Sequence, residues 1–400
     1  MGSRLRWISR RPRHLVLIAP IVVLLGVPLV LHSQLQQVIA RLAEPGCPSS
    51  GAVFTVSPTD SSAFAYLIPL GNLSPPDHTI PTDHVYYVFP GDMNQGPPPV
   101  TSVRAPATIH IGRVSHITAI VSGGVRSHDY KLDFSPCRGV EAYFDHITSL
   151  SPALSRAVSA AGEQCEEHHP RPSATYRYCN SNFDFVAQAG EVIGQAGGGT
   201  AAGFDFGATD DRSPPMAYAN PSRYNQRHVV CPFDLFVGSL RDSFLTRFGG
   251  PGGPRTIAPV CGTVMQDQAG TAQGNWFIGD VTSGNPEGWN KSLALVHDNF
   301  DPSQGVVSFG GNGGGAFRLD FIPMSSGTIN REFSGITPGH EVYCFESVGQ
   351  QGQQTSTQSS SQPARRVLIQ LLSATRLLFE AQTGSCRSAF ALVSPTTYSR

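Results

Sequence analysis

The sequence predicts a mainly β protein with two domains. Its 400 residues include 42 glycines and 32 prolines, whereas charged residues make up only 14% of the chain, a composition typical of turn-rich β folds. Hydrophobic residues account for 40%, which is enough for two cores at this length. Short strand-like runs, separated by turn residues, recur through residues 61–235 and again through residues 255–400.

An apolar segment, residues 15–31, follows a head whose charged side chains are all arginines. The segment is long enough to cross a bilayer as a helix, and the arginine excess before it places the N-terminus in the cytoplasm. We therefore expect a cytoplasmic basic head at 1–14, a transmembrane signal-anchor at 15–33 in contact with the lipid bilayer, and a stalk at 34–60. A cleaved signal peptide is the alternative, but no Ala-x-Ala-like site follows the apolar run.

The cysteines predict disulfide bonds and an extracytoplasmic location. All eight lie after the apolar segment, and no C-x-x-C pair is present that would suggest a zinc ribbon or a redox motif. Because oxidising compartments favour disulfides, we expect as many as four. Two pairs are suggested by their positions, Cys165 with Cys179 across a short loop and Cys344 with Cys386 between two late strands. The eight residues are Cys47, Cys137, Cys165, Cys179, Cys231, Cys261, Cys344 and Cys386.

The charge distribution argues against a nucleic-acid partner. The net charge is −1, and setting aside the five arginines of the basic head leaves −6 for the remainder. Phosphate binding needs clustered Lys and Arg, and the chain after the head has no such cluster.

The first domain, residues 61–235, contains a series of predicted strands and one short helix. The helix covers Pro152–Ala161, where apolar residues recur at helical spacing, and a polar loop with His168 and His169 is expected after it. The predicted strands are Ala63–Leu67, His84–Phe89, Thr108–Ile111, His116–Val121, Lys131–Phe134, Val140–Ile147, Phe183–Ala187 and Gly203–Gly207.

A linker at residues 236–254 is predicted to separate the domains. It combines a possible helix, Phe236–Phe248, with a glycine- and proline-rich run that ends at Pro254. The all-β domain at 255–400 has no recognisable role, and its Gln- and Ser-rich stretch Gly349–Gln362 is expected to be a mobile hairpin loop. The predicted strands of this domain are Asn275–Ile278, Ser292–His297, Gly305–Phe309, Ala316–Phe321, His340–Glu346, Arg366–Leu372, Leu377–Glu380 and Ala389–Val393.

Four motifs follow one another in the second half of the first domain. A strand reading Tyr-Phe-Asp-His occupies 143–146, Ala-Gly-Glu-Val-Ile-Gly occupies 189–194, a glycine loop occupies 197–199 and a strand reading Gly-Phe-Asp-Phe occupies 203–206. This order resembles the lysostaphin-type (LytM-like) zinc endopeptidase domain, which has Tyr-x-His-Leu, Val-x-x-Gly-x-x-Ile-Gly, a glycine loop and His-x-His-Phe. The resemblance covers about residues 65–210 and implies a barrel-sandwich fold for this domain.

The resemblance also implies a zinc site. In the family a histidine, an aspartate four residues later and the second histidine of the late strand hold the metal, and two further histidines flank the attacking water. Zinc with three protein ligands and one open position lowers the pKa of bound water to near neutrality, and a neighbouring histidine transfers protons. By this resemblance His78, Asp83, His84 and Asp205 are candidate metal ligands, and His146 is the candidate catalytic residue.

The chain departs from the family pattern in three places. His78 and Asp83 are five residues apart rather than four, and Gly203 and Asp205 stand where the two histidines of the late pair are expected. Asp205 is able to bind zinc through oxygen, but Gly203 cannot transfer a proton. Because residues i and i+2 of a strand share one face, we expect that Gly203→His together with Asp205→His would rebuild the late pair.

These features predict a membrane-anchored, extracytoplasmic protein of the cell envelope. Because the metal site departs from the family pattern, we expect a degenerate lysostaphin-like domain that binds glycan or peptide. One alternative is an active zinc metallohydrolase, an endopeptidase acting on cell-wall peptides. A disulfide-stabilised structural surface protein is the other.

Overall fold

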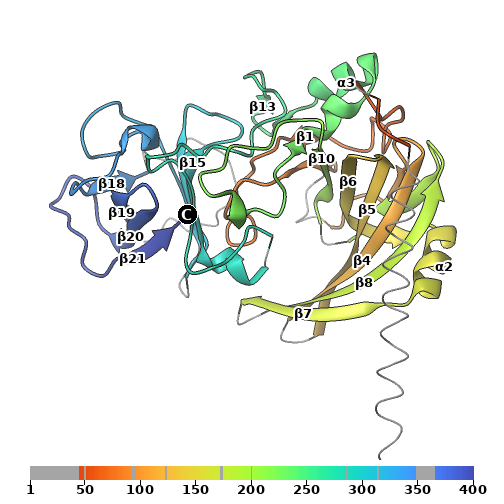
Figure 1. The fold of residues 1–400 in the computed structure, drawn as a ribbon, viewed down its shortest axis with the longest axis horizontal. Coiled ribbons are helices and arrows are strands. Elements are labelled where there is room, and N and C mark those ends of the chain that lie inside the picture. The colour runs from red at the N-terminus through yellow and green to blue at the C-terminus, as the bar shows by residue number, and fades with distance from the viewer. Residues whose placement is uncertain are drawn as a thin grey trace, which may run out of the picture. The chain divides into compact units, whose positions relative to one another are not determined.

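A computed structural model describes residues 45–48, 51–91, 96–121, 124–171, 174–199, 201–284, 286–312, 315–347 and 365–400. The expected basic head, the signal-anchor, part of the stalk and the expected loop Gly349–Gln362 lie outside these residues. In the part of the chain that is described, no helix has the length and apolar character needed to cross a membrane. Residues Pro45–Arg400 form one compact unit, which contains two large antiparallel sheets and a small hairpin (Figure 1).

The first sheet has eleven strands, most of which follow the order β1-β2-β10-β6-β5-β4-β8-β7. β11 pairs with β10, and β9 joins β3 to β6. The strands are β1 Tyr66–Ile68, β2 His84–Val88, β3 Thr101–Arg104, β4 Ile109–Val121, β5 Gly124–Cys137, β6 Val140–Leu150, β7 Gln164–Arg171, β8 Ala174–Ala187, β9 Val192–Ala196, β10 Gly203–Asp210 and β11 Val229–Val230.

One face of the first sheet forms the main core. On β10, Phe204 and Phe206 are fully buried, and their ring centroids lie 5.8 and 4.8 Å from that of Phe144 on β6. Since successive side chains of a strand point to opposite faces, Asp205 points away from this core. The polar face of the sheet is therefore defined by the same alternation that builds the core.

The helix predicted at Pro152–Ala161 is confirmed as α2, which lies beside β8 (Figure 1). The Ser151 hydroxyl caps it by accepting a hydrogen bond from the backbone N–H of Leu154 at 3.3 Å. Leu154 and Val158 are buried in the main core. The polar loop predicted after this helix is wrong, because residues 164–171 form the edge strand β7, and an edge strand can be polar on both faces.

The segment expected as a linker, residues 236–254, packs against the first sheet. It contains α3 (Gly238–Leu245) and the hairpin strands β12 (Gly249–Gly250) and β13 (Gly253–Pro254). The rings of Phe244 and Phe248 are buried, with centroids 4.5 and 5.5 Å from that of Phe233. These aromatic contacts, and the Cys231–Cys261 disulfide that spans the segment, tie it to the main core.

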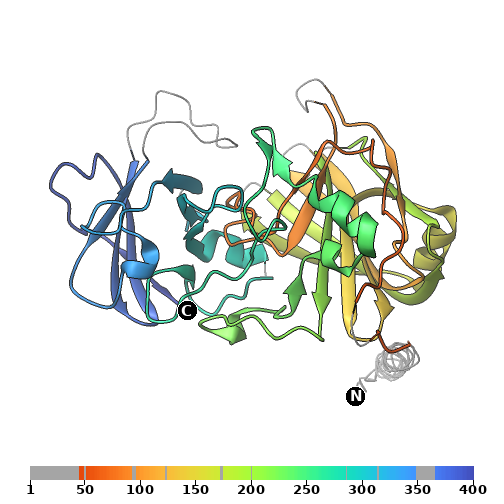
Figure 2. The same cartoon turned by 90° about the horizontal axis from the view of Figure 1, so that it is seen from above.

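The second sheet is a nearly closed eight-stranded antiparallel barrel, in blue and blue-green in Figure 2, with the strand order β17-β16-β15-β14-β21-β20-β19-β18. Its interior is filled by large side chains that include Trp276, Phe379 and Tyr398. The strands are β14 Gly274–Phe277, β15 Ser292–His297, β16 Gly305–Phe309, β17 Phe317–Phe321, β18 Tyr343–Glu346, β19 Arg365–Ser373, β20 Arg376–Thr383 and β21 Thr396–Ser399.

The predicted last strand, Ala389–Val393, is wrong. The Glu380 carboxylate accepts hydrogen bonds from the backbone N–H groups of Val393 and Ser394 at 2.7 and 3.1 Å. A side chain therefore satisfies backbone groups that a neighbouring strand would otherwise bind. The strand that completes the barrel, β21, begins only at Thr396.

Four disulfides are present and confirm the expectation from the cysteine count. They join Cys47 to Cys137, Cys165 to Cys179, Cys231 to Cys261 and Cys344 to Cys386. The second and fourth of these are the pairs that the sequence suggested, and no cysteine of the described residues is free. Four disulfides suggest an extracytoplasmic location.

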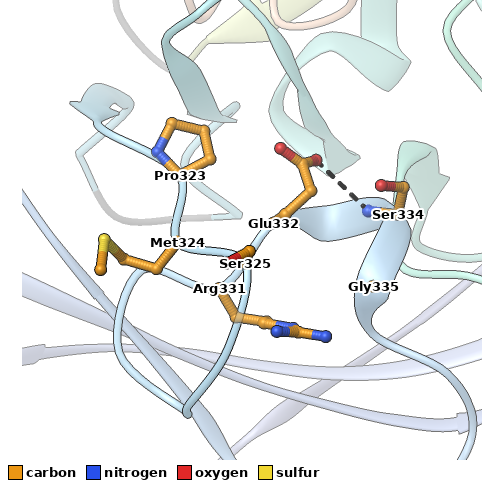
Figure 3. A pocket seen from close by; sticks show the side chains of 7 residues that line it. All are labelled: Pro323, Met324, Ser325, Arg331, Glu332, Ser334 and Gly335. Carbon is orange, nitrogen blue, oxygen red and sulfur yellow. Dashed lines mark hydrogen bonds between the residues drawn. The ribbon is translucent and has the colours of Figure 1, made fainter.

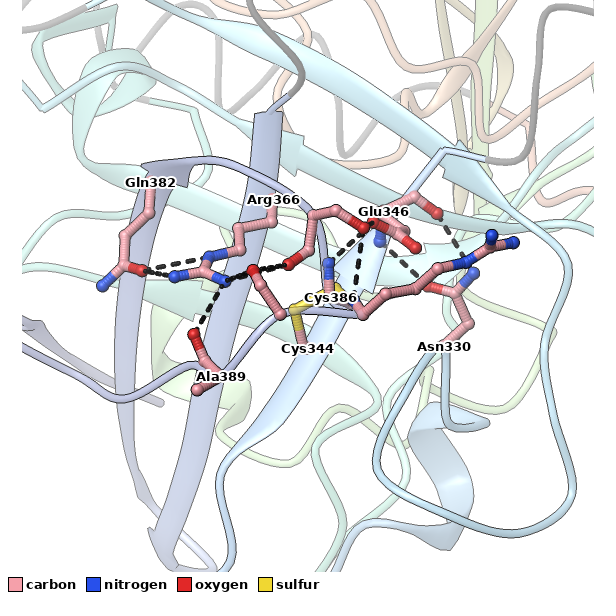
Figure 4. The surroundings of a disulfide bond; sticks show 10 residues. Asn330, Cys344, Glu346, Arg366, Gln382, Cys386 and Ala389 are labelled. Atoms are coloured by element: carbon pink, nitrogen blue, oxygen red, sulfur yellow. Dashed lines mark hydrogen bonds between the residues drawn. A yellow bond between two sulfur atoms is a disulfide. The ribbon is translucent and has the colours of Figure 1, made fainter.

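Polar contacts surround the Cys344–Cys386 disulfide (Figure 4). The Glu346 carboxylate accepts hydrogen bonds from the Cys386 backbone N–H at 2.7 Å and from the Ser385 hydroxyl at 2.8 Å. The Arg366 guanidinium binds the Ser385 carbonyl at 2.9 Å. These contacts fix the loop after β20 onto β18 and β19.

Replacing Cys344 and Cys386 together by alanine should lower the free energy of unfolding by about 2–4 kcal/mol, because the bond closes a loop with a sequence separation of 42 residues. Urea unfolding followed by tryptophan fluorescence measures the change, since Trp276 lies inside the barrel. Unchanged stability in the double variant would show that the bond adds nothing to the barrel.

Candidate functional site

The candidate residues from three separate parts of the chain meet on the polar face of the first sheet. His84 Nε2 lies 3.3 Å from Asp205 Oδ2, and His146 Nε2 lies 3.6 Å from the same oxygen. β10 lies between β2 and β6 and pairs with both, so its Asp205 is reached from either side. The arrangement thus follows from the strand order.

Asp83 and Tyr143 orient the His84 ring. His84 Nδ1 lies 3.0 Å from Asp83 Oδ1 and 3.0 Å from the Tyr143 hydroxyl, and that hydroxyl donates to Asp83 at 2.8 Å. Gly207 provides the necessary space, because a Cβ there would lie 2.3 Å from the Tyr143 ring. Asp83 therefore holds the edge of His84 opposite to Asp205, as a carboxylate holds a metal-binding histidine.

A β-bulge turns His146 toward Asp205. Two residues of β6, Asp145 and His146, lie opposite Lys131 alone, and a bulge of this kind re-aims a side chain. His146 has φ of 62°, a conformation that non-glycine residues rarely adopt and that costs on the order of 1–3 kcal/mol. Its ring is held from behind, since Nδ1 lies 2.9 Å from Asp129 Oδ2.

His78 completes the group of histidines. It lies in the segment before β2, with its ring centroid 5.4 Å from that of His84. Burial lowers the pKa of His78 to about 3, and the neighbouring charges of His84 and His146 add to this effect. The imidazole is therefore neutral at physiological pH, the form that binds metals.

The carboxylates control the charge of the other two histidines. Burial alone would lower the pKa of His84 and of His146, but the charge of Asp205 raises both, the latter to about 10. Burial also raises the pKa of the Asp145 carboxyl to about 6. For Asp83 burial acts in the same direction, but the hydrogen bond from His84 outweighs it and lowers the pKa. The Asp205 carboxylate therefore favours the charged form of both imidazoles.

Two buried atoms at the centre of the site lack hydrogen bonds. His84 Nε2 and Asp205 Oδ1 have no hydrogen-bond partner among the described residues, although their side chains are only 9% and 4% exposed. Nearly all buried polar atoms of native proteins are hydrogen-bonded, and an exception calls for a water or an ion. A cation bound to the neutral form of His84 would satisfy Nε2.

Two further groups of potential ligands were not predicted from the sequence. Asp129, Asp145 and His146 offer ligand atoms that lie within 4.8 Å of one another, and this group adjoins the candidate site. Glu163 lies similarly close to Cys165 and Cys179, but both sulfurs belong to a disulfide and do not bind a metal. The alternation along β5 predicts that Asp129 and Lys131 share one face of the sheet. The contact between Asp129 and His146 depends on the strand order, which the sequence does not reveal.

The barrel has a separate hollow of about 340 Å³, which is distant from these residues in the sequence (Figure 3). Glu332 at its wall accepts a hydrogen bond from the Ser334 backbone N–H at 3.4 Å, and its Oε1 lies 3.0 Å from His297 Nε2. The lining residues are Pro323, Met324, Ser325, Arg331, Glu332, Ser334 and Gly335.

Stability should depend on pH through His297 and Glu332. Their hydrogen bond raises the pKa of His297 above 6.5 and lowers that of Glu332 below 4.5. The contribution of His297 to the free energy of unfolding is complete below pH 6.5 and is lost as the pH rises through the pKa of His297 in the folded protein. The contribution of Glu332 is complete above pH 4.5 and is lost as the pH falls through the pKa of Glu332 in the folded protein. The destabilisation by Glu332→Gln, measured by urea unfolding, should therefore be largest between these two values. An equal loss at pH 9 would contradict this account.

Gly203 does not accept a side chain. A Cβ at this position would lie 1.8 Å from the backbone carbonyl oxygen of Tyr87 on the paired strand β2. The expectation that Gly203→His and Asp205→His rebuild a late histidine pair is therefore not supported by the geometry. The reason is the close approach of two backbones, which the sequence does not reveal.

Gly203→Ala alone should destabilise the first sheet by at least 1–3 kcal/mol, the usual range for overpacking. Gly238→Ala is a suitable control, because a Cβ at Gly238 meets no atom within 4 Å. Thermal unfolding of the two variants makes the comparison, and equal melting temperatures would show that β2 and β10 have room to separate.

Comparisons with protein-family models, with curated proteins and with solved structures find no match for this chain.

Proposed function

We propose that the polar face of the first sheet binds zinc and that the protein is an extracytoplasmic metal-dependent hydrolase of cell-envelope peptides. The convergence of His84 and His146 on Asp205, with a carboxylate behind each ring, carries this proposal. Metal-binding histidines are oriented in this way in known sites. The order of motifs that resembles the lysostaphin-type family supports the same function, with a barrel-sandwich fold as its structural counterpart.

The distance between His84 and Asp205 fits two ligands of a tetrahedral metal. Two donors bound to one zinc at about 2.0–2.2 Å lie about 3.3–3.6 Å apart in tetrahedral geometry. His84 Nε2 and Asp205 Oδ2 are 3.3 Å apart, and neither residue has solvent access that would stabilise its charge. His78, which is neutral and lies beside His84, is the third candidate ligand.

His146 suits proton transfer better than metal binding. Its side chain is 38% exposed, compared with 9% for His84 and 4% for Asp205. Asp129 holds Nδ1 and leaves Nε2 directed at the site. An exposed and oriented imidazole is able to exchange protons with a bound substrate.

Each of these residues would have its own role in the reaction. Zinc at this site would supply a Lewis acid and a water of lowered pKa. His146 would donate a proton from Nε2 to the leaving nitrogen, while Asp129 stabilises the charged ring. Asp83 and Tyr143 keep the His84 ring in place. The glycine at 203 leaves one proton-transfer residue fewer than in the family, which corresponds to a rate lower by about 10²–10⁴-fold.

The same glycine favours a second candidate, a metal-containing domain that binds glycan or peptide without cleaving it. In both cases the disulfides suggest the extracytoplasmic side, and residues 15–33 are proposed to anchor the chain in the cell membrane. Binding without turnover would explain why a substitution that removes a proton-transfer residue is tolerated.

The zinc content of the full-length protein, purified in detergent, tests the metal site. We expect about one zinc per chain by elemental analysis, and a loss of most of it in His84→Ala and in Asp205→Ala, each of which removes a ligand. His110→Ala is the matched control, because His110 pairs with Asp184 away from the site. A wild-type protein without zinc after incubation with the metal would exclude the proposal and leave the structural surface protein.

Hydrolysis of cell-wall peptides separates the two candidates. His146→Ala should retain zinc and lower the rate by about 10²–10⁴-fold, since it removes proton transfer and no ligand. Release of new amino groups from cell-wall fragments provides the assay. Stoichiometric zinc without any hydrolysis by the wild type would favour the binding function.

A further inference from the structure

The segment between β1 and β2, residues 69–83, carries both His78 and Asp83 and lies against the outer wall of the barrel. Leu73, 2% exposed, forms an apolar cluster with Val296 of β15 and Val306 of β16. Ala294 belongs to the same cluster, and Ile80 packs against it. Because β15 alternates, Leu293 and Leu295 fill the barrel interior instead. The outer wall of the barrel is thus an apolar surface that this segment covers.

Three contacts between side chains and backbone carbonyls join residues 69–83 to the barrel. Asn299 Nδ2 donates to the Pro69 carbonyl at 3.1 Å, and Arg318 Nη1 donates to the Leu73 carbonyl at 3.3 Å. The Thr79 hydroxyl lies 3.2 Å from the Trp289 carbonyl oxygen and 2.9 Å from that of Pro76. Thr79 directly follows His78, so the last contact lies beside the candidate ligand.

The donors on the barrel side are themselves held in place. Arg318 forms ion pairs with Asp298 and Asp320, and its side chain is 14% exposed. Asn299 is 3% exposed. A buried, paired arginine has few alternative positions, so it is a rigid anchor for the segment that binds it.

A tight turn connects this anchor to the site. The backbone N–H groups and carbonyls of Ser74 and His78 exchange hydrogen bonds of 2.9 and 3.1 Å. The closed turn therefore links the position of His78 to that of Leu73. A segment of this length without regular structure would otherwise lose considerable conformational entropy on ordering.

We propose that the barrel is a positioning module for the metal site: its outer wall holds residues 69–83 so that His78 lies beside His84. Leu73, Thr79 and Arg318 are then positioning residues, since they act through His78 and Asp83. The inference rests on the proposed metal function, and it assigns a role to residues 255–400, for which the sequence indicates none.

Leu73→Ala tests this role in the full-length protein. Loss of the apolar contact should release the turn and weaken zinc binding by about 10–100-fold, the usual effect of removing support behind a ligand. Leu377→Ala, which truncates an equally buried leucine inside the barrel, should keep the wild-type zinc affinity. Competition with a chromophoric chelator gives the affinities, and the visible spectrum of the cobalt-substituted protein reports the coordination number.

Thr79 offers a finer comparison. Thr79→Val removes the hydroxyl that contacts both Pro76 and Trp289 and should alter the cobalt spectrum. Thr79→Ser retains the hydroxyl, and its spectrum should match that of the wild type. Equal zinc affinity in the wild type and Leu73→Ala, or equal losses in Leu73→Ala and Leu377→Ala, would overturn the positioning role.

Amide hydrogen exchange separates this role from the metal function. In metal-free protein, residues 74–80 should exchange faster in Leu73→Ala than in Leu377→Ala, because only the former lacks the contact with the outer wall. If the wild type binds no zinc, the proposed function fails, and the exchange rates still decide whether the barrel orders this segment. Identical rates in the two variants would contradict the inference directly.

Discussion

The buried carboxylate of Asp205 is the constraint on which the site depends. It lies on β10, between β2 and β6, and is only 3% exposed. A buried charge has to be balanced by a partner, and the directly opposed residue on β6 is another aspartate, Asp145. His84 and His146 provide the balance from the two flanking strands. The bulge in β6 is the structural change that allows the second of them to reach Asp205.

Residues around the site support this arrangement, some in contact with the histidine rings and others farther away. Asp83 and Asp129 orient the two histidine rings, Gly207 leaves space for the Tyr143 ring, and the outer wall of the barrel covers the segment with His78. The aromatic core beneath the sheet fixes the strands that carry these groups. Each sheet has its own core, and the proposed positioning role would make the two sheets parts of one functional unit.

Local patterns made much of the fold predictable. Helical spacing after Ser151 and Pro152 identified α2, and most strands of both sheets follow the expected runs. The polar residues of β7 predict a loop from the sequence alone, because an edge strand lacks the alternation of a half-buried one. The candidate residues were predicted by their order along the chain. Their partners Asp129 and Tyr143 were not, because strand order and the bulge arise from pairing between distant segments.

The location of a bound metal tests the central claim most directly. Crystals of the protein grown with zinc, measured on both sides of the zinc absorption edge, give the position of the ion by anomalous scattering. The account predicts one strong peak within about 2.0–2.2 Å of His84 Nε2 and of an Asp205 carboxylate oxygen. A peak elsewhere, such as between Asp129 and Asp145, or the absence of any peak on this face of the sheet, would contradict it.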